Sequence, residues 1–174
     1  MQGLAGTFLR SERGTAGAEM ALILPVLFAL IFTLAEAGNY MWTEHKVVKG
    51  VRDGARYAAR LSFSNYDCPA SAGATQLLPN GAERTAIQNM TRTGRVDGQA
   101  QAKVPGWQNG QVNVFYDCNA SYASGLYEGA AGAQRVTVTT VVPYGPKVSL
   151  LGLLGFDVVN VHVRAQAQAA VGGL

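Results

Sequence analysis

The chain has 174 residues, a formal net charge of +3, and 14% charged against 48% hydrophobic residues. This length predicts one domain plus an anchor, and the positive excess is too small to indicate a nucleic-acid-binding protein. Glycine is abundant, at 21 residues, but it follows no collagen-like period.

The first predicted element is an apolar run over residues 15–35, TAGAEMALILPVLFALIFTLA. A helix needs roughly 20 apolar residues to cross a bilayer, so the run predicts a transmembrane helix. Glu19 interrupts it, and an ionised carboxylate in hydrocarbon costs several kcal/mol unless it is paired. Arg10 and Arg13 precede the run and outnumber Glu12. The positive-inside rule therefore predicts a cytoplasmic N-terminus and a translocated C-terminal part.

The N-terminus has a basic leader that ends at Gly14, and Glu19 is the fifth residue after that glycine. This arrangement resembles the N-terminus of type IV prepilins and pseudopilins. In those proteins a prepilin peptidase cuts after the glycine, which implies a leader of residues 1–14 and a cut between Gly14 and Thr15. The new amine of Thr15 can then pair with Glu19 of a neighbouring subunit. Such a pair offsets part of the desolvation cost and fixes the axial register of adjacent helices.

Two other interpretations of the N-terminus stay open. Ala35-Glu36-Ala37 is a small-residue box of the kind that ends a secretory signal peptide, and cleavage there would release a soluble periplasmic protein. An uncleaved anchor is the second alternative, with Glu19 at the membrane edge and no role for Gly14.

Helical spacing continues through residues 36–62, which predict an amphipathic stalk. One helix from near Ala18 to near Ser62 would be about 65 Å long. Pro25 predicts a kink in the membrane half of this helix, and Gly50 and Gly54 lower the intrinsic helix propensity of its second half. Residues at spacings of three and four form an apolar face: Val47, Val51, Ala55 and Ala58. Basic residues at the same spacings form a stripe, more typical of a solvated face than of an interface: Lys49, Arg52, Arg56 and Arg60.

Residues 63–174 predict an extracytoplasmic domain. Proline, glycine and asparagine mark residues 64–80 as a loop, and residues 82–91 predict a short helix with Ile87 and Met90 facing inward. Alternation of valine and threonine predicts three half-buried strands, over residues 111–117, 135–142 and 157–169. The apolar segment 143–156 either covers the sheet or meets a partner or the bilayer surface. The predicted fold class is α+β, with the long helix packed on a small antiparallel sheet.

Cys68 and Cys118 both follow the apolar run. Outside the inner membrane a disulfide between them is expected, and the alternative is two buried thiols. Neither lies in a CxxC motif, so no metal site is predicted. His45 and His162 lack a carboxylate or nucleophile at a motif spacing, so no catalytic residue, cofactor or enzymatic activity is expected.

Two segments together resemble the TadE family of minor pseudopilins. Glu19, Ala21, Leu22 and Pro25 fall on the family's Glu-x-Ala-Leu…Pro pattern in the membrane helix. A second signature, an Arg-acid-Gly-Ala-Arg run, matches these stalk residues: Arg52, Asp53, Gly54, Ala55 and Arg56. Methionine follows Glu19 where the major Tad pilins carry tyrosine, and the major pilins are much shorter, so the resemblance implies an accessory subunit.

The resemblance implies assembly of a tight adherence (Tad, Flp) pilus, a type IV-like organelle of cell adhesion. Implied partners are other pilin and pseudopilin subunits, a prepilin peptidase, an inner-membrane assembly platform with its ATPase, and the lipid bilayer. The implied location is a bacterial inner membrane, crossed once, with a periplasmic C-terminal domain. The alternative function is a membrane-anchored or secreted periplasmic binding module with an unknown ligand.

Overall fold

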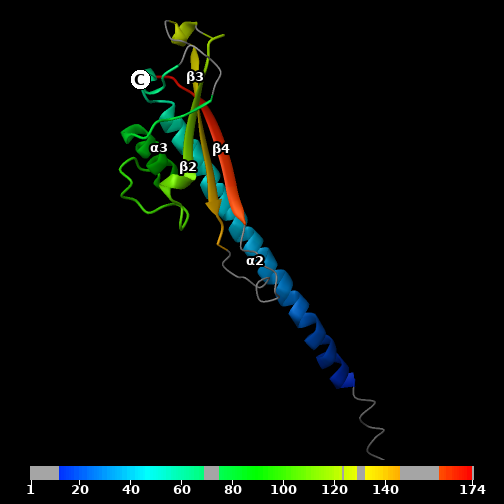
Figure 1. The fold of residues 1–174 in the computed structure, drawn as a ribbon. Coiled ribbons are helices and arrows are strands. Elements are labelled where there is room, and N and C mark those ends of the chain that lie inside the picture. Colours follow the sequence, from blue (N-terminus) through cyan, green and yellow to red (C-terminus); the bar gives the residue numbers. More distant parts are fainter. Residues whose placement is uncertain (1–11, 69–74, 123, 129–131, 146–160, 174) are drawn as a thin grey trace, which may run out of the picture. The chain divides into compact units, whose positions relative to one another are not determined.

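The computed structural model describes residues 12–68, 75–122, 124–128, 132–145 and 161–173. These residues divide into two units, the first at residues 12–39 and the second comprising the described residues from 40 onward. We call the second unit the C-terminal domain. Figure 1 shows its sheet beside the C-terminal part of helix α2.

Helix α2 spans Glu12–Ala58, 47 residues and therefore about 70 Å. The prediction of one long helix is confirmed. The expected start near Ala18 is already helical, and the helix ends at Ala58, four residues before the expected Ser62. It ends where the chain turns into a short 3-10 helix, Phe63–Asn65, which Ser62 caps by accepting a hydrogen bond from the Ser64 backbone. Pro25 lies inside the helix, and helical backbone continues on both sides of it.

A four-stranded sheet has the order β1-β2-β3-β4 and is antiparallel throughout. Its strands are β1 (Gln76–Leu77), β2 (Val112–Asn119), β3 (Ala133–Pro143) and β4 (His162–Ala170). The three predicted strands are confirmed, and with them the α+β class. In the third strand, Val159 lies outside the described residues, as does most of the apolar segment 143–156. Strand β1 lies in the segment predicted as a loop, because two residues are too few for alternation to reveal a strand.

One hydrophobic core joins α2 to the inner face of the sheet. The predicted apolar face of α2 is confirmed, since none of its four side chains is more than 2% exposed. The alternating strand residues pack against it, with these positions buried: Val112, Val114, Tyr116, Val136, Val138, Thr140, Val142 and Val163. Trp107, from the connection before β2, completes this core and donates its indole N–H to Thr140 at 3.0 Å.

Helix α3 spans Ala82–Thr93 and ends at Gly94, which adopts the left-handed conformation of a helix C-cap. Ile87 is fully buried, as predicted. Met90 was predicted to face inward but is only partly buried. The inward face of α3 instead includes polar residues, among them Gln88, whose amide donates to the Val112 carbonyl of β2 at 3.0 Å.

Candidate functional site

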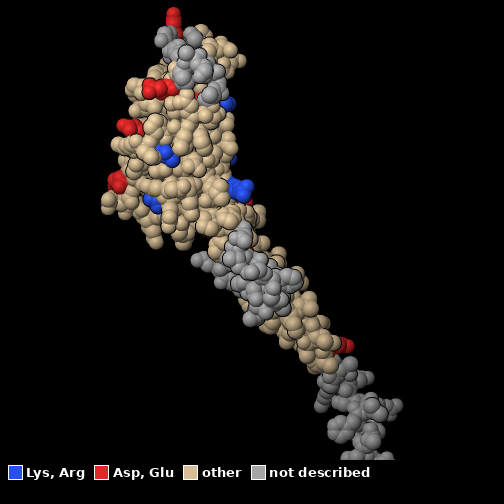
Figure 2. All heavy atoms as spheres, viewed as in Figure 1, with Lys and Arg blue, Asp and Glu red and all other residues tan. Residues whose placement is uncertain are grey.

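The N-terminal part of α2 is an exposed apolar surface. This stretch is long and apolar enough to cross a membrane, and none of its most apolar 18-residue window is buried. On the face seen in Figure 2 this part of α2 is uncharged, apart from acidic atoms close to the N-terminal end of the described helix. Exposed large side chains run along it as far as Met41 and Trp42, which are 58% and 62% exposed.

The residues of the predicted membrane signature all lie in this helix. Glu19, Ala21, Leu22 and Pro25 are exposed, and Leu22 is 77% exposed. The backbone of residues 14 and 15, where we expect cleavage, is also part of α2. A helix in lipid with an exposed carboxylate needs either a partner for that charge or access to the headgroups.

The stalk signature divides into residues that face inward and residues that face outward. Gly54 and Ala55 are buried. Gly54 lies under Thr91 of α3, since a Cβ there would collide with the Thr91 hydroxyl, and a Cβ on Gly50 would collide with the Thr91 carbonyl and the Trp107 ring. The two glycines therefore allow α3 to approach α2 closely.

Asp53 joins α2 to the segment after α3. Its carboxylate accepts a hydrogen bond from the Lys103 ammonium at 3.1 Å, and both side chains are about one quarter exposed, at 31% and 21%. Arg52 and Arg56 are exposed, and neither makes a hydrogen bond or ion pair within the described part of the chain. The fold thus uses the three central residues of the signature and leaves its two arginines in solvent.

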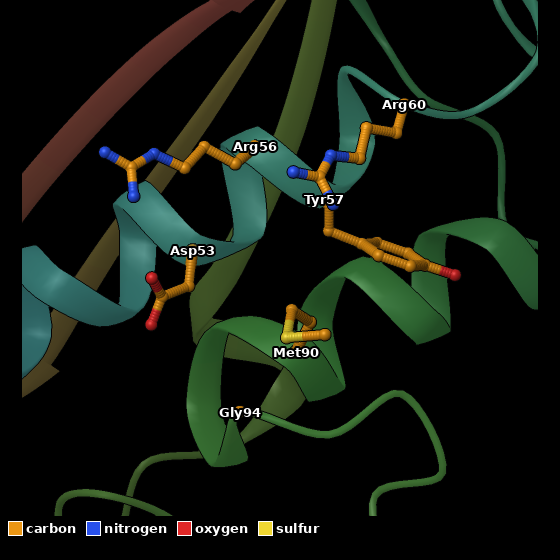
Figure 3. Close-up of a pocket in the computed structure, with 6 residues that line it drawn as sticks. All are labelled: Asp53, Arg56, Tyr57, Arg60, Met90 and Gly94. Carbon is orange, nitrogen blue, oxygen red and sulfur yellow. The ribbon is translucent and has the colours of Figure 1, made fainter. Parts of the chain in front are cut away.

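A shallow groove of about 320 Å³ lies between the C-terminal ends of α2 and α3 (Figure 3). Its lining comes from both helices: Asp53, Arg56, Tyr57, Arg60, Met90 and Gly94. Figure 3 shows the Tyr57 ring and the Met90 thioether in the space between the two helices, with Arg56 reaching out from α2 and Arg60 from the turn that follows it. The groove combines an apolar floor with two cations. The stripe of basic residues was predicted, and Met90 was predicted to face inward, but its meeting with Tyr57 was not, because no periodicity reveals that two helix ends meet.

Cys68 and Cys118 form a disulfide, as predicted, with their Cα atoms 5.7 Å apart. The bridge ties the segment after α2 to β2. Nearby, the buried Tyr66 hydroxyl donates to the Ala58 carbonyl at the end of α2, at 2.6 Å. Burial, and secondarily the Tyr57 phenol, raise the pKa of Tyr66 above its ordinary value.

Among the described residues, no three or more His, Cys, Asp and Glu side chains gather as a metal site would require.

Residues 14–56 match the family model described as TadE-like protein. Residues 14–56 are therefore a TadE-like segment. It covers both predicted signatures, from Gly14 through Glu19 to Arg56. No curated protein and no solved structure matches the chain.

Proposed function

We propose that the chain is a minor pilin-like subunit that assembles a Tad-type adhesion pilus. A TadE-like segment indicates a Tad pilus-related role. One observation carries the finer proposal: the TadE-like segment coincides with a helix whose apolar surface is exposed and which carries Glu19 five residues after the expected cleavage point. Such a surface needs lipid or other apolar helices to cover it.

In this proposal a prepilin peptidase cuts between Gly14 and Thr15 at the cytoplasmic face of a bacterial inner membrane. The helix remains in the membrane as a single span, and the C-terminal domain lies in the periplasm. The assembly platform then packs the helix against those of other pilin and pseudopilin subunits. The role that we propose is structural rather than enzymatic.

Glu19 acts in assembly rather than in folding. It is exposed and precedes Val47, the first α2 residue of the buried core, by 28 residues of the sequence. The amine that cleavage creates on Thr15 of one subunit pairs with Glu19 of the next. Any other axial offset leaves a carboxylate in lipid without a partner, so the pair sets the register of the helices.

A secreted periplasmic protein is the competing function. Cleavage after Ala35-Glu36-Ala37 would cut within α2, which continues as regular helix from there to Ala58. A signal-peptide box is expected at the end of its apolar core, whereas here regular helix continues for about 20 residues beyond the box. The continuity of α2 favours the anchored form.

The test is Glu19→Leu, which removes the charge and keeps the segment apolar. The variant should insert into the membrane and fold its C-terminal domain as wild type does, while pilus formation and co-purification of pilin partners fall sharply. Val26→Ala is a control, because Val26 is an exposed apolar residue of the same helix outside the signature, and the change leaves the charge unaltered. Wild-type assembly by Glu19→Leu would reject the register role.

A further inference from the structure

The exposed cations of the C-terminal domain are unevenly distributed. Several basic side chains are held by the fold, through hydrogen bonds, ion pairs or a ring contact: Lys46, Arg84, Arg92, Arg95, Lys103 and Arg135. Among the basic residues whose side chains the structure describes, five have no such partner: Lys49, Arg52, Arg56, Arg60 and Arg164. Four of these five follow one another along α2 and the turn that ends it.

These four residues, Lys49, Arg52, Arg56 and Arg60, form what we call the basic column. Their spacings of three and four place them on one face of the helix, opposite the buried face that contains Val51. Like charges at such spacings repel one another and destabilise an isolated helix. The helix dipole favours a cation in the last turn, which accounts for Arg56, but it does not account for Lys49 or Arg52.

The C-terminal part of the basic column borders the groove between α2 and α3. Arg56 and Arg60 flank it, and Tyr57 and Met90 give it an apolar floor. Asp53 also lines the groove, but its charge is already compensated by Lys103 at 3.1 Å. The groove therefore keeps a net positive charge beside exposed apolar atoms, which suits a ligand with both carboxylates and apolar side chains.

The distance from the expected membrane surface indicates which kind of anion can reach the groove. The exposed apolar side chains of α2 end at Trp42, a residue type that favours the membrane interface. Arg56 lies fourteen residues further along the helix, about 21 Å at 1.5 Å per residue. The headgroup region is only about 5–8 Å thick on each side of a bilayer, so lipid phosphates do not reach the groove.

We propose that the basic column and its groove bind an acidic protein segment of a neighbouring pilus subunit. Aspartate and glutamate side chains of that segment pair with Arg52, Arg56 and Arg60, and apolar side chains between them contact Tyr57 and Met90. The identity of the partner rests on the proposed function, whereas the acidic chemistry rests on the charges alone. Arginine suits this role because its planar guanidinium binds carboxylates in bidentate fashion.

The test uses the full chain in nanodiscs of uncharged lipid and a fluorescent peptide of alternating glutamate and leucine. Fluorescence anisotropy should show binding that weakens when salt is raised from about 50 to about 200 mM. Arg56→Glu should lower the affinity by at least about tenfold, since it replaces attraction by repulsion in the groove. Arg56→Lys should lower the affinity less than Arg56→Glu does, because lysine keeps the positive charge but cannot bind a carboxylate in bidentate fashion.

Arg164→Glu is the matched control. Arg164 is exposed on β4, has no partner in the described structure, and gives the same change in net charge. It should leave peptide affinity within about twofold of wild type, because its charge lies outside the groove. An equal loss of peptide affinity in Arg56→Glu and Arg164→Glu would show that net charge alone governs binding, and it would overturn the proposal. So would a drop in the melting temperature of Arg56→Glu large enough to account for lost binding.

Two further arms separate the alternatives. Vesicles of phosphatidylglycerol that bind wild type but not Arg56→Glu, with no peptide binding, would identify a lipid site and overturn the proposal. Glu19→Leu should bind the peptide as wild type does, and Arg56→Glu should still be cleaved after Gly14. Failure of peptide binding therefore leaves the proposed assembly function intact, and failure of cleavage or assembly leaves the binding result intact.

Discussion

At the scale of single residues, two glycines set the packing of the C-terminal domain. Glycine inside a helix costs about 1 kcal/mol relative to alanine, which makes Gly50 and Gly54 unfavourable for α2 in isolation. The structure explains both, because the Thr91 backbone and side chain of α3 occupy the space that a Cβ would need. Thr91 is itself fixed, since its hydroxyl donates to the Ile87 carbonyl at 2.8 Å. Tolerance of substitution should therefore differ sharply between glycines of the same helix.

Gly54→Ala should destabilise the C-terminal domain. Overpacking against Thr91 costs about 1–3 kcal/mol and exceeds the gain in helix propensity. Gly38→Ala is the control, because Gly38 lies in the same helix and a Cβ added there would have no neighbouring atom within 4 Å. Thermal unfolding followed by near-ultraviolet circular dichroism should give a lower Tm for Gly54→Ala only. Equal stability of the two variants would contradict close packing at Gly54.

Tyr66 should make the domain sensitive to alkali. Its pKa is raised in the folded state, mainly by burial, so at a pH above about 10 the phenol ionises in the unfolded chain first. The stabilisation of the folded domain that comes from keeping the Tyr66 phenol neutral is complete below that pH and is lost as the pH rises. Tyr66→Phe should be less stable at neutral pH by about 1 kcal/mol, because the buried hydrogen bond from the Tyr66 hydroxyl to the Ala58 carbonyl is lost, but it should lose less stability on going to pH 11.

Urea unfolding at neutral and alkaline pH measures both effects. Tyr122→Phe removes a phenol that is 64% exposed and is expected to keep the alkaline loss of wild type. A Tyr66→Phe variant with the same alkaline loss as wild type would show that other groups govern this pH dependence.

At the scale of elements, periodicity predicted most of the fold. The three- and four-residue spacing of Val47, Val51, Ala55 and Ala58 predicted the buried face of α2, and alternation predicted β2, β3 and most of β4. Both signals are local, since each reports which side of one element is buried. Strand β1 was not predicted, because it has only two residues and is recognised only through its pairing with Tyr116 and Phe115 of β2. The inward position of Gln88 on α3 was not predicted, because its partner, the Val112 carbonyl, lies 24 residues further along the chain.

The disulfide should contribute strongly to stability. Cys68 and Cys118 are separated by 50 residues, and closing a loop of that length stabilises a fold by about 4 kcal/mol on chain-entropy grounds. A strong reductant should therefore lower the Tm by roughly 15 °C. A Cys68→Ala/Cys118→Ala variant should melt near the reduced wild type and not respond to reductant. A reductant effect on that variant would show that the chain's only two cysteines are not its cause.

At the scale of the whole molecule, α2 combines an exposed apolar segment with a buried face in the C-terminal domain. Sequence alone located the candidate site as two signatures, and the TadE-like match over residues 14–56 includes both. The sequence alone could not distinguish the signature residues that are buried or paired in the fold from those left exposed. That distinction depends on α3, whose Thr91 contacts Gly54, and on Lys103, which lies fifty residues after Asp53 and pairs with it only in the folded chain.

The central proposal is a subunit that a prepilin peptidase matures and that keeps its apolar helix. Intact mass spectrometry of the protein purified from membranes tests it most directly. The mass should correspond to a chain that begins at Thr15, lacking residues 1–14. Gly14→Leu is the matched variant, because it removes the residue after which cleavage is expected, and it should retain the full-length mass. A wild-type mass that includes Met1, or a chain that begins at Gly38, would contradict the proposal.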